Sequence, residues 1–187
     1  MHRINPERAA LVVVDVQNGF VNEHSRHVVP VVVKLVREWS AVGGAVVFTR
    51  YRNYPDSPYE RLFSWTRLQG PPETDLVPEL HDLVGEAAAI IDKTGYSFFT
   101  PAAERLVTQQ GWGDLVFCGI ATESCVLKSA ADAFERGHSP WLVTDACASD
   151  AGPAVHEAGL LVARRLIGRG QLITTEHVLT PAREVHR

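Results

Sequence analysis

The chain has 187 residues, about the length of one α/β domain and enough to bury a sizeable core. Its net charge of −4 argues against a nucleic-acid-binding surface, which normally carries a basic stripe. The three cysteines are spaced irregularly and do not form a disulfide framework, so we expect a reducing, cytoplasmic location. We also expect no membrane partner, because the N-terminus lacks the apolar core of a signal peptide and no apolar run is long enough to span a bilayer.

Six short apolar segments are predicted to be strands covered on both faces, because apolar and β-branched residues run through them without alternating with polar ones. They span residues 10–14, 45–49, 88–92, 115–118, 141–144 and 172–174. Residues 145–150 (DACASD) are predicted to form a polar turn after the fifth strand.

Helical patterns separate these strands. They cover residues 29–42, 76–84, 100–111 and 153–167, and a short helix is expected after the last strand. A further helix begins a few residues after Gly119, carries apolar residues every three or four positions up to Phe134, and ends at Gly137. Strands alternating with helices imply right-handed crossovers, so the sequence predicts an α/β fold with a mostly parallel six-stranded sheet between layers of helices. No repeat or linker divides the chain, which we interpret as a single domain over residues 1–187.

Cys125 lies where the fourth strand turns into the following helix. Backbone N–H groups are unpaired at a helix start, and the positive end of the helix dipole favours a thiolate, the nucleophilic form of cysteine. The alternative is a small buried hydrophobic residue, which is the usual role of a free cysteine. The position favours a nucleophile, although this residue alone does not decide between the two.

Two further reactive side chains lie at strand ends: Asp15 follows the first strand and Lys93 follows the third. Ligands bind beyond the carboxyl ends of parallel strands, so Asp15, Lys93 and Cys125 are expected to converge on one crevice if their strands are neighbours. Taken singly, Asp15 could cap a turn, and Lys93 could be a solvated or ion-paired side chain. Their coincidence with Cys125 favours catalysis.

A carboxylate, an ammonium group and a thiol in one crevice suit nucleophilic catalysis. Asp15 can accept the thiol proton of Cys125 and later return it to the leaving group or activate water. Lys93 can stabilise the thiolate and hold the carboxylate by charge attraction. The backbone N–H groups of Ala121 and Cys125 could bind the oxyanion of a tetrahedral intermediate.

Residues 50–72 form the longest irregular stretch, rich in Tyr, Pro, Arg and Trp, and loops of this length in compact domains are usually functional. Four aromatic residues are candidate walls of the substrate pocket, because aromatic faces exclude water and hold flat amides. They are Phe20, Tyr51, Trp65 and Tyr96, and plain packing is the alternative for each. Gln17 is a candidate to orient Asp15 or the substrate, with a loop hydrogen bond as the equal alternative.

Three spaced motifs resemble the isochorismatase-like cysteine hydrolase superfamily: D-x-Q-N-x-F at 15–20, D-K-T-G-Y-S-F-F at 92–99 and G-I-A-T-E-S-C-V at 119–126. That group includes nicotinamidases, N-carbamoylsarcosine amidases, and ureidoacrylate and biuret amidohydrolases. The segments VTDACAS and LITTEHVL are also similar to it. The resemblance implies a Rossmann-like fold with a six-stranded parallel sheet and a triad of Asp15, Lys93 and Cys125. It also implies a cis peptide bond between Ile120 and Ala121 that directs backbone N–H groups into an oxyanion hole.

The chain departs from nicotinamidases in the region of their metal site. Those relatives carry an Asp-x-His unit soon after the second strand and another histidine in the following loop. Here residues 49–65 hold Asp56 and no histidine. His24 and His27 lack a plausible third ligand, so we expect no metal site and no cofactor.

Isochorismatases cleave a vinyl ether and need not use a cysteine nucleophile, so the presence of Cys125 favours an amide or ureido substrate. The sequence therefore predicts a cofactor-free hydrolase of a C–N bond in a small molecule, acting through a thioester acyl-enzyme. Two alternatives stay open: a vinyl-ether hydrolase of the isochorismatase type, and a catalytically silent binding protein of the same fold. The resemblance also implies a homodimer or larger homo-oligomer.

Overall fold

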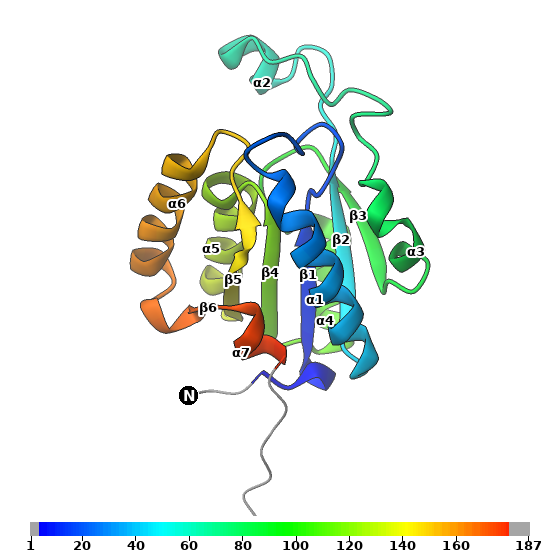
Figure 1. Cartoon of the computed structure of the whole chain (residues 1–187), viewed down its shortest axis with the longest axis vertical. Helices are drawn as coiled ribbons and strands as arrows, with labels where there is room; N and C mark the ends of the chain where they lie inside the picture. Colours follow the sequence, from blue (N-terminus) through cyan, green and yellow to red (C-terminus); the bar gives the residue numbers. More distant parts are fainter. Residues whose placement is uncertain (1–3, 180–187) are drawn as a thin grey trace, which may run out of the picture.

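Six parallel strands form the centre of the protein, in the order β3-β2-β1-β4-β5-β6 (Figure 1). The computed structural model describes residues 4–179. The strands are β1 (Ala9–Val14), β2 (Ala45–Tyr51), β3 (Ala89–Lys93), β4 (Asp114–Ile120), β5 (Ser139–Ala148) and β6 (Leu172–Ile173). The six predicted strands and their parallel arrangement are confirmed.

Helices cover both faces of this sheet, as the alternation of elements predicts. The helices of the described residues are α1 (Val29–Ala41), α2 (Pro58–Phe63), α3 (His81–Val84), α4 (Pro101–Gln110), α5 (Leu127–Glu135), α6 (Pro153–Leu166) and α7 (Thr175–Leu179). Figure 1 shows α1 and α7 in front of the sheet and α4 and α5 behind it, with α6 beside α5. No helix among residues 4–179 combines the length and the apolar character needed to cross a membrane.

The two central strands, β1 and β4, are the most deeply buried part of the fold. Every residue of β1 is buried, and so are residues 115–120 of β4. Coverage on both faces explains why these strands are continuous apolar runs. On α5, by contrast, Phe134 was expected on the buried face but is 54% exposed, because Ser129, Ala130 and Ala133 form that face.

The strand order changes direction between β1 and β4. The chain continues from β1 to β2 and β3 on one side, and from β4 to β5 and β6 on the other. In such sheets a crevice forms at the carboxyl ends of the two central strands, where the connections diverge. Asp15 directly follows β1 and Cys125 lies shortly after β4, so the topology brings both to this crevice.

The fifth strand is longer than its apolar run suggests. The predicted polar turn over residues 145–150 was wrong, because residues 145–148 continue β5 beside β4. A register shift between Phe117 and Gly119 marks a bulge, after which Gly119 pairs with Cys147. The Asp145 carboxylate in this stretch accepts hydrogen bonds from the N–H and hydroxyl of Thr175, at 2.8 and 2.7 Å. The carboxylate of Asp145 therefore has hydrogen-bond donors although it lies inside the strand.

The segment 50–72 contains more regular structure than predicted. Its first two residues complete β2, and residues 58–63 form the short helix α2. Ser57 caps α2 by accepting a hydrogen bond from the Glu60 N–H at 3.2 Å, and Pro58 occupies the first helical position. Figure 1 shows α2 projecting from the carboxyl end of the sheet, the same end as the crevice.

Candidate active site

The side chains of Asp15, Lys93 and Cys125 meet beyond the carboxyl ends of the strands. Lys93 Nζ lies 2.6 Å from Asp15 Oδ2 and 3.4 Å from Cys125 Sγ, so the ammonium group bridges the other two side chains. The three residues are 0%, 3% and 5% exposed, in chain order. Lys93 comes from β3, which is separated from β1 by β2, and its long side chain reaches across the end of that strand. The structure thus brings together the three side chains, although β3 is not a neighbour of β1.

Asp15 is held in one orientation by Thr49 on the neighbouring strand β2. The Thr49 hydroxyl donates to Asp15 Oδ1 at 2.5 Å and accepts a hydrogen bond from the Asp15 N–H at 3.1 Å. Asp15 itself has a φ of 48°, a left-handed conformation that is uncommon outside glycine and that Asp tolerates better than most residues. Thr49 was not among the predicted site residues. The sequence feature that could have identified Thr49 is its place as a polar residue near the carboxyl end of a buried strand.

Lys93 is surrounded by acceptors in addition to Asp15. Its Nζ donates to the backbone carbonyls of Gly95 and Tyr96, at 3.0 and 3.2 Å, and lies 5.5 Å from the centre of the Tyr51 ring. Burial by itself lowers the pKa of Lys93, but the negative charge of Asp15 and the adjacent sulfur outweigh it and raise that pKa above its usual value. Lys93 therefore stays a cation.

Cys125 lies in a π-helical turn, Thr122–Val126, which we call the cysteine turn; the regular helix α5 begins after it. The peptide bond between Ile120 and Ala121 is cis, as the resemblance implies. The Ala121 carbonyl accepts hydrogen bonds from two N–H groups of the cysteine turn, at 3.2 and 3.1 Å, which closes the turn onto the end of β4.

Gly119 allows the end of β4 to approach β1 closely. Its φ is 116°, and a Cβ built at this position would lie 2.1 Å from the carbonyl oxygen of Val14. Only glycine fits there. Because Val14 precedes Asp15, this contact fixes the distance between the acid and the segment that leads to Cys125.

The surroundings of Cys125 favour the protonated form of its thiol. Burial raises the pKa of this thiol, the Asp15 carboxylate raises it further, and the Lys93 cation offsets part of the increase. The expected effect of the helix dipole, which favours a thiolate, is opposed here by desolvation and by the carboxylate. Hydrogen bonding between the thiol and Asp15 contributes to the raised pKa, so the carboxylate is placed to take the proton.

The cysteine turn packs directly against α6. A Cβ built at Gly159 would lie 2.9 Å from the backbone of Glu123, so no side chain fits between helix and turn. One turn earlier on α6, His156 Nδ1 lies 2.7 Å from the Thr122 hydroxyl, and burial lowers the pKa of His156. Helix α6 therefore fixes the outer side of the turn that carries Cys125.

Five aromatic rings gather beside the triad, and four of them are the predicted pocket walls. The fifth is Tyr59 on α2. The ring centre of Tyr51 lies 6.1 Å from that of Phe20, 5.8 Å from that of Trp65 and 5.3 Å from that of Tyr59. The ring centres of Tyr59 and Tyr96 are 5.2 Å apart. We call these five rings the aromatic cluster.

Two rings of the aromatic cluster, Tyr51 and Tyr59, interact electrostatically with Cys125. Burial raises the pKa of Tyr51 and of Tyr59, and interaction with Cys125 contributes to both shifts. Both phenols therefore stay neutral and can donate hydrogen bonds near the sulfur. Tyr59 was missed at the level of the sequence. The pair Ser57 and Pro58, a typical helix start, was the signal for a helix at this point.

Gln17 supports the loops around the site. Its amide nitrogen donates to the carbonyls of Tyr51 and Thr74, at 3.0 and 2.8 Å, and its amide oxygen accepts a hydrogen bond from the Tyr51 N–H at 2.7 Å. Both amide hydrogens are used and the residue is fully buried, so none remains for a ligand. These contacts correspond to the loop hydrogen-bond alternative for Gln17.

The residues considered for a metal site do not form a ligand group of three. Asp56, in the segment compared with nicotinamidases, is exposed and lies 3.7 Å from Arg61 Nε. His24 and His27 are exposed as well. Among residues 4–179, no group of three or more His, Cys, Asp or Glu side chains is placed to hold a metal ion. The side chains present do not fit a metal site of the nicotinamidase type, so we assign no step to a metal.

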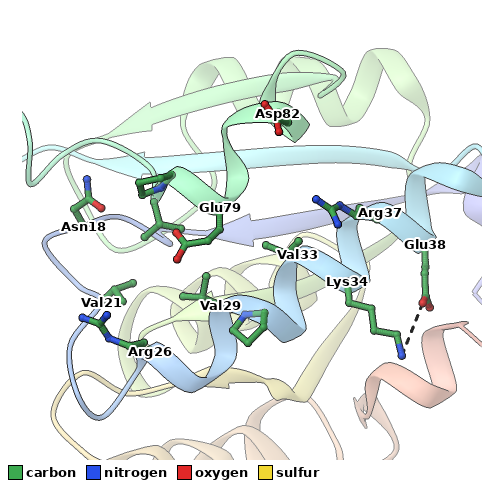
Figure 2. A pocket seen from close by; sticks show the side chains of 13 residues that line it. Asn18, Val21, Arg26, Val29, Val33, Lys34, Arg37, Glu38, Glu79 and Asp82 are labelled. Carbon is green, nitrogen blue, oxygen red and sulfur yellow. Dashed lines mark ion pairs between the residues drawn. The ribbon is translucent and has the colours of Figure 1, made fainter.

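A separate groove of about 1090 Å³ lies beside α1 (Figure 2). Figure 2 shows Val29 and Val33 on its α1 side and Glu79 on the facing segment. No residue of the triad lines this groove, and Lys34 on its rim pairs with Glu38 at 3.8 Å. The groove is therefore distinct from the site formed by the triad.

Comparison with known proteins gives consistent matches over the whole described fold. The family model described as "Isochorismatase domain" matches residues 9–177. The isochorismatase family protein YwoC of Bacillus subtilis is 30% identical over 183 residues, which cover 94% of this chain and 95% of that protein. The ureidoacrylate amidohydrolase RutB of Acinetobacter baylyi is 27% identical over 203 residues, covering 89% and 81%. A solved cysteine hydrolase from Pseudomonas syringae has the same fold, with a TM-score of 0.85, 21% identity and coverage of 96% and 94%.

Proposed function

This chain belongs to the isochorismatase family and is a hydrolase, and we propose that it cleaves the C–N bond of a small amide or ureido compound through a thioester on Cys125. The observation that carries the proposal is the buried bridge formed by Lys93, 2.6 Å from Asp15 and 3.4 Å from Cys125. A base, a cation and a thiol within hydrogen-bond reach of one another are the groups that nucleophilic acyl transfer needs. The proposed reaction uses no cofactor.

In the first half-reaction, Asp15 takes the thiol proton of Cys125 while the sulfur attacks the substrate carbonyl carbon. A C–S bond forms, and the carbonyl electron pair moves to oxygen to give a tetrahedral oxyanion. When this intermediate collapses, the C–N bond breaks, Asp15 passes its proton to the nitrogen, and ammonia or an amine leaves. Lys93 remains a cation throughout and stabilises the negative charge that develops on sulfur.

In the second half-reaction, water attacks the thioester carbonyl while Asp15 removes a proton from that water. The C–S bond breaks, the thiolate takes the proton back from Asp15, and the acid product leaves. We propose that the backbone N–H groups of Ala121 and Cys125 bind the oxyanion in both half-reactions, because both residues lie where β4 gives way to the cysteine turn.

The aromatic cluster supports a small, flat acyl group as the part of the substrate next to Cys125. Aromatic faces exclude water and stack on planar amide and ureido groups. The phenols of Tyr51 and Tyr59 stay neutral, so they can donate hydrogen bonds to a polar substituent. The relative named as a ureidoacrylate amidohydrolase supports including ureido acids among the compounds to be tested.

The test is a screen for ammonia release by the purified protein across primary amides and N-carbamoyl compounds, repeated with Cys125→Ala. We expect turnover by the wild type, none by the variant, and a Cys125 acyl adduct in the mass spectrum of the wild type trapped early in turnover. Retained amide hydrolysis by Cys125→Ala would refute the nucleophile.

Two other outcomes of this screen identify the alternatives. Hydrolysis of isochorismate at equal rates by wild type and Cys125→Ala would indicate a vinyl-ether hydrolase in which the thiol takes no part. Absence of turnover on every compound, together with no adduct from an electrophilic amide, would indicate a silent binding protein.

We also propose that two copies of the chain associate through α6. Its outward face exposes Leu161 and Val162, and Glu157 and Arg165 lie four residues before and after Leu161. A two-fold antiparallel pairing of α6 with its copy therefore places each Glu157 opposite an Arg165 around a shared apolar contact. Sedimentation should give a dimer for the wild type and a monomer for Leu161→Glu. A monomeric wild type at micromolar concentration would contradict this pairing.

We propose a reducing, cytoplasmic location for the protein. The cysteines at positions 118, 125 and 147 are all free and buried, and the proposed reaction requires a reduced sulfur at Cys125. Fractionation of cells with an antibody against the protein tests this location.

A further inference from the structure

Ser129 lies one helical turn after Cys125 and is fully buried on α5. Its hydroxyl donates a hydrogen bond to the backbone carbonyl of Cys125 at 2.6 Å. Serines inside helices often bond back to the carbonyl four residues earlier, and that contact alone has no functional meaning. The same hydroxyl, however, also accepts a hydrogen bond from the backbone N–H of Phe98 at 2.8 Å. Ser129 therefore joins the backbone of Cys125 to that of Phe98, which lies 27 residues earlier in the chain than Cys125.

The second segment holds the catalytic cation. Residues 94–100 connect β3 to α4, and we call this connection the lysine loop. Within it, the carbonyls of Gly95 and Tyr96 accept hydrogen bonds from Lys93 Nζ at 3.0 and 3.2 Å. Phe98, two residues later, is fully buried and bonds to Ser129. The hydroxyl of Ser129 is thus the direct link between the backbone of the nucleophile and the loop that orients Lys93.

A second polar residue of α5 contacts the same loop. Asp132, one turn after Ser129 and largely buried, interacts with the Ser97 hydroxyl and pairs with Lys128. These contacts outweigh the effect of burial and lower the pKa of Asp132, so its carboxylate stays charged. Helix α5 therefore contacts the lysine loop from two successive turns, through Ser129 and Asp132. Of these two residues, Ser129 also bonds to Cys125.

We propose that Ser129 is a positioning residue that sets the separation of Lys93 Nζ and Cys125 Sγ, which is 3.4 Å here. This role rests on the proposed function only in its effect on turnover, because the separation of Lys93 and Cys125 also determines how reactive the thiol is without any substrate. The Lys93 cation lowers the pKa of Cys125 against the effects of burial and Asp15. If the lysine loop moves away, this stabilisation of the thiolate weakens. Loss of the Ser129 hydroxyl should therefore make Cys125 less reactive at a given pH.

The test compares alkylation of Cys125 by iodoacetamide from pH 7 to 10 in the wild type, Ser129→Ala and Ser129→Thr. In Ser129→Ala we expect alkylation at pH 9 to slow about fivefold, as the loss of one hydrogen bond implies, and the rate profile to move to higher pH. Ser129→Thr keeps the hydroxyl and should restore most of the rate. With an amide substrate, kcat should fall by a similar factor while KM changes little.

The matched control is Thr144→Val, which removes a hydroxyl that donates to the Ile173 carbonyl at 3.1 Å, at the β5–β6 edge. Thr144→Val should leave the alkylation rate and kcat unchanged. Urea unfolding of Ser129→Ala and Thr144→Val checks that the two variants are equally stable. If Ser129→Ala and Thr144→Val give the same alkylation profile, the positioning role is wrong. The alkylation result stands even if the wild type hydrolyses no amide, so failure of this proposal is distinguishable from failure of the proposed function.

Discussion

The crevice of Asp15, Lys93 and Cys125 and the segment 53–68 beside it are built in different ways. In the crevice, all three side chains are almost completely buried and hydrogen-bonded. In the segment, Leu62 and Phe63 on α2 are 75% and 64% exposed. We infer that the strand ends determine which reaction is possible, whereas the segment determines which molecules reach the sulfur.

The segment 53–68 is closed mainly by its own residues. Its ends meet where the Asn53 N–H donates to the Leu68 carbonyl at 2.8 Å, and the Asn53 side chain bonds to Ser57 and to the Trp65 carbonyl, at 2.6 and 3.0 Å. A compact loop with adjoining ends can change in sequence without moving the strands beneath it. The crevice has no such freedom, because the contacts among Asp15, Thr49, Lys93 and Cys125 join different strands or the connections that follow them.

Replacing Lys93 with Met should have the largest effect, because it removes the charge that compensates a fully buried Asp15. We expect the rate of amide hydrolysis to fall about 1000-fold and the free energy of unfolding to fall by about 3 kcal/mol at pH 7. Steady-state kinetics and urea unfolding measure the two losses. If Lys93→Met keeps the wild-type free energy of unfolding, the buried ion pair does not stabilise the crevice, and this difference from the segment 53–68 is wrong.

Replacing Gly119 with Ala should damage the crevice through the backbone alone. The new Cβ would meet the Val14 carbonyl at 2.1 Å and would occupy a conformation with φ of 116°. We expect a loss of about 3 kcal/mol in the free energy of unfolding, from overpacking and backbone strain. Gly85→Ala is the control, because that glycine has a φ of −64° and no atom within 4 Å of the new Cβ. Equal melting temperatures for Gly119→Ala and Gly85→Ala would contradict the close approach of Gly119 to the Val14 carbonyl.

Raising the pH should destabilise the crevice and the core behind it before it affects the aromatic cluster. Burial raises the pKa of Cys118, Cys125 and Cys147 above the ordinary value of 9.0, so each thiol ionises in the unfolded chain first. The stabilisation that protonated thiols give is complete below pH 9.0 and is lost as the pH rises above it, at up to about 1.4 kcal/mol per pH unit and thiol. The stabilisation that the protonated tyrosines of the cluster give is lost only above pH 10.0, the ordinary pKa of tyrosine.

Urea unfolding under reducing conditions at pH 8, 9.5 and 10.5 measures this decline. Cys147→Ala should make it shallower by about one third, because one of three thiols no longer titrates. A free energy of unfolding that stays constant from pH 8 to 10.5 would be inconsistent with three thiols protonated in the native state.

Replacing Tyr59 with Ala should have the smallest of these effects and should act on substrate choice. The variant loses ring contacts to Tyr51, Trp65 and Tyr96. We expect KM to rise about tenfold, as the loss of a buried ring contact implies, while kcat changes little. Leu62→Ser on the same helix is the control and should change stability by less than about 0.5 kcal/mol. A fall in kcat at constant KM in Tyr59→Ala would show that the segment takes part in the chemistry.

The part of the fold and site that the sequence could predict is the part determined by local pattern. Continuous apolar runs mark strands that are covered on both faces, and reactive residues at their ends lie at one edge of a parallel sheet. For that reason Asp15, Lys93 and Cys125 could be placed together without coordinates. Phe20, Tyr51, Trp65 and Tyr96 were chosen as candidate pocket walls because aromatic faces exclude water and hold flat amides. Their rings lie in one cluster, together with Tyr59.

The parts that could not be predicted depend on contacts between distant segments. The extension of β5 through Asp145 requires the bulge beside Gly119 and the bonds to Thr175, which no local pattern encodes. The raised pKa of Cys125 depends on burial and on a carboxylate 110 residues earlier, whereas a local argument considers only the helix that follows Cys125. Ser129 is an ordinary helical serine until its bond to Phe98 is known.

The absence of a side chain at Gly159 has a practical use. Because α6 rests on the backbone of Glu123 with nothing between them, the outer helix and the turn that carries the sulfur form one mechanical unit. A fluorophore attached at the exposed position 154 of α6 would then sense any shift of the turn as the proposed acyl group forms and departs. The outside of the molecule would thereby report each turnover without any label in the crevice itself.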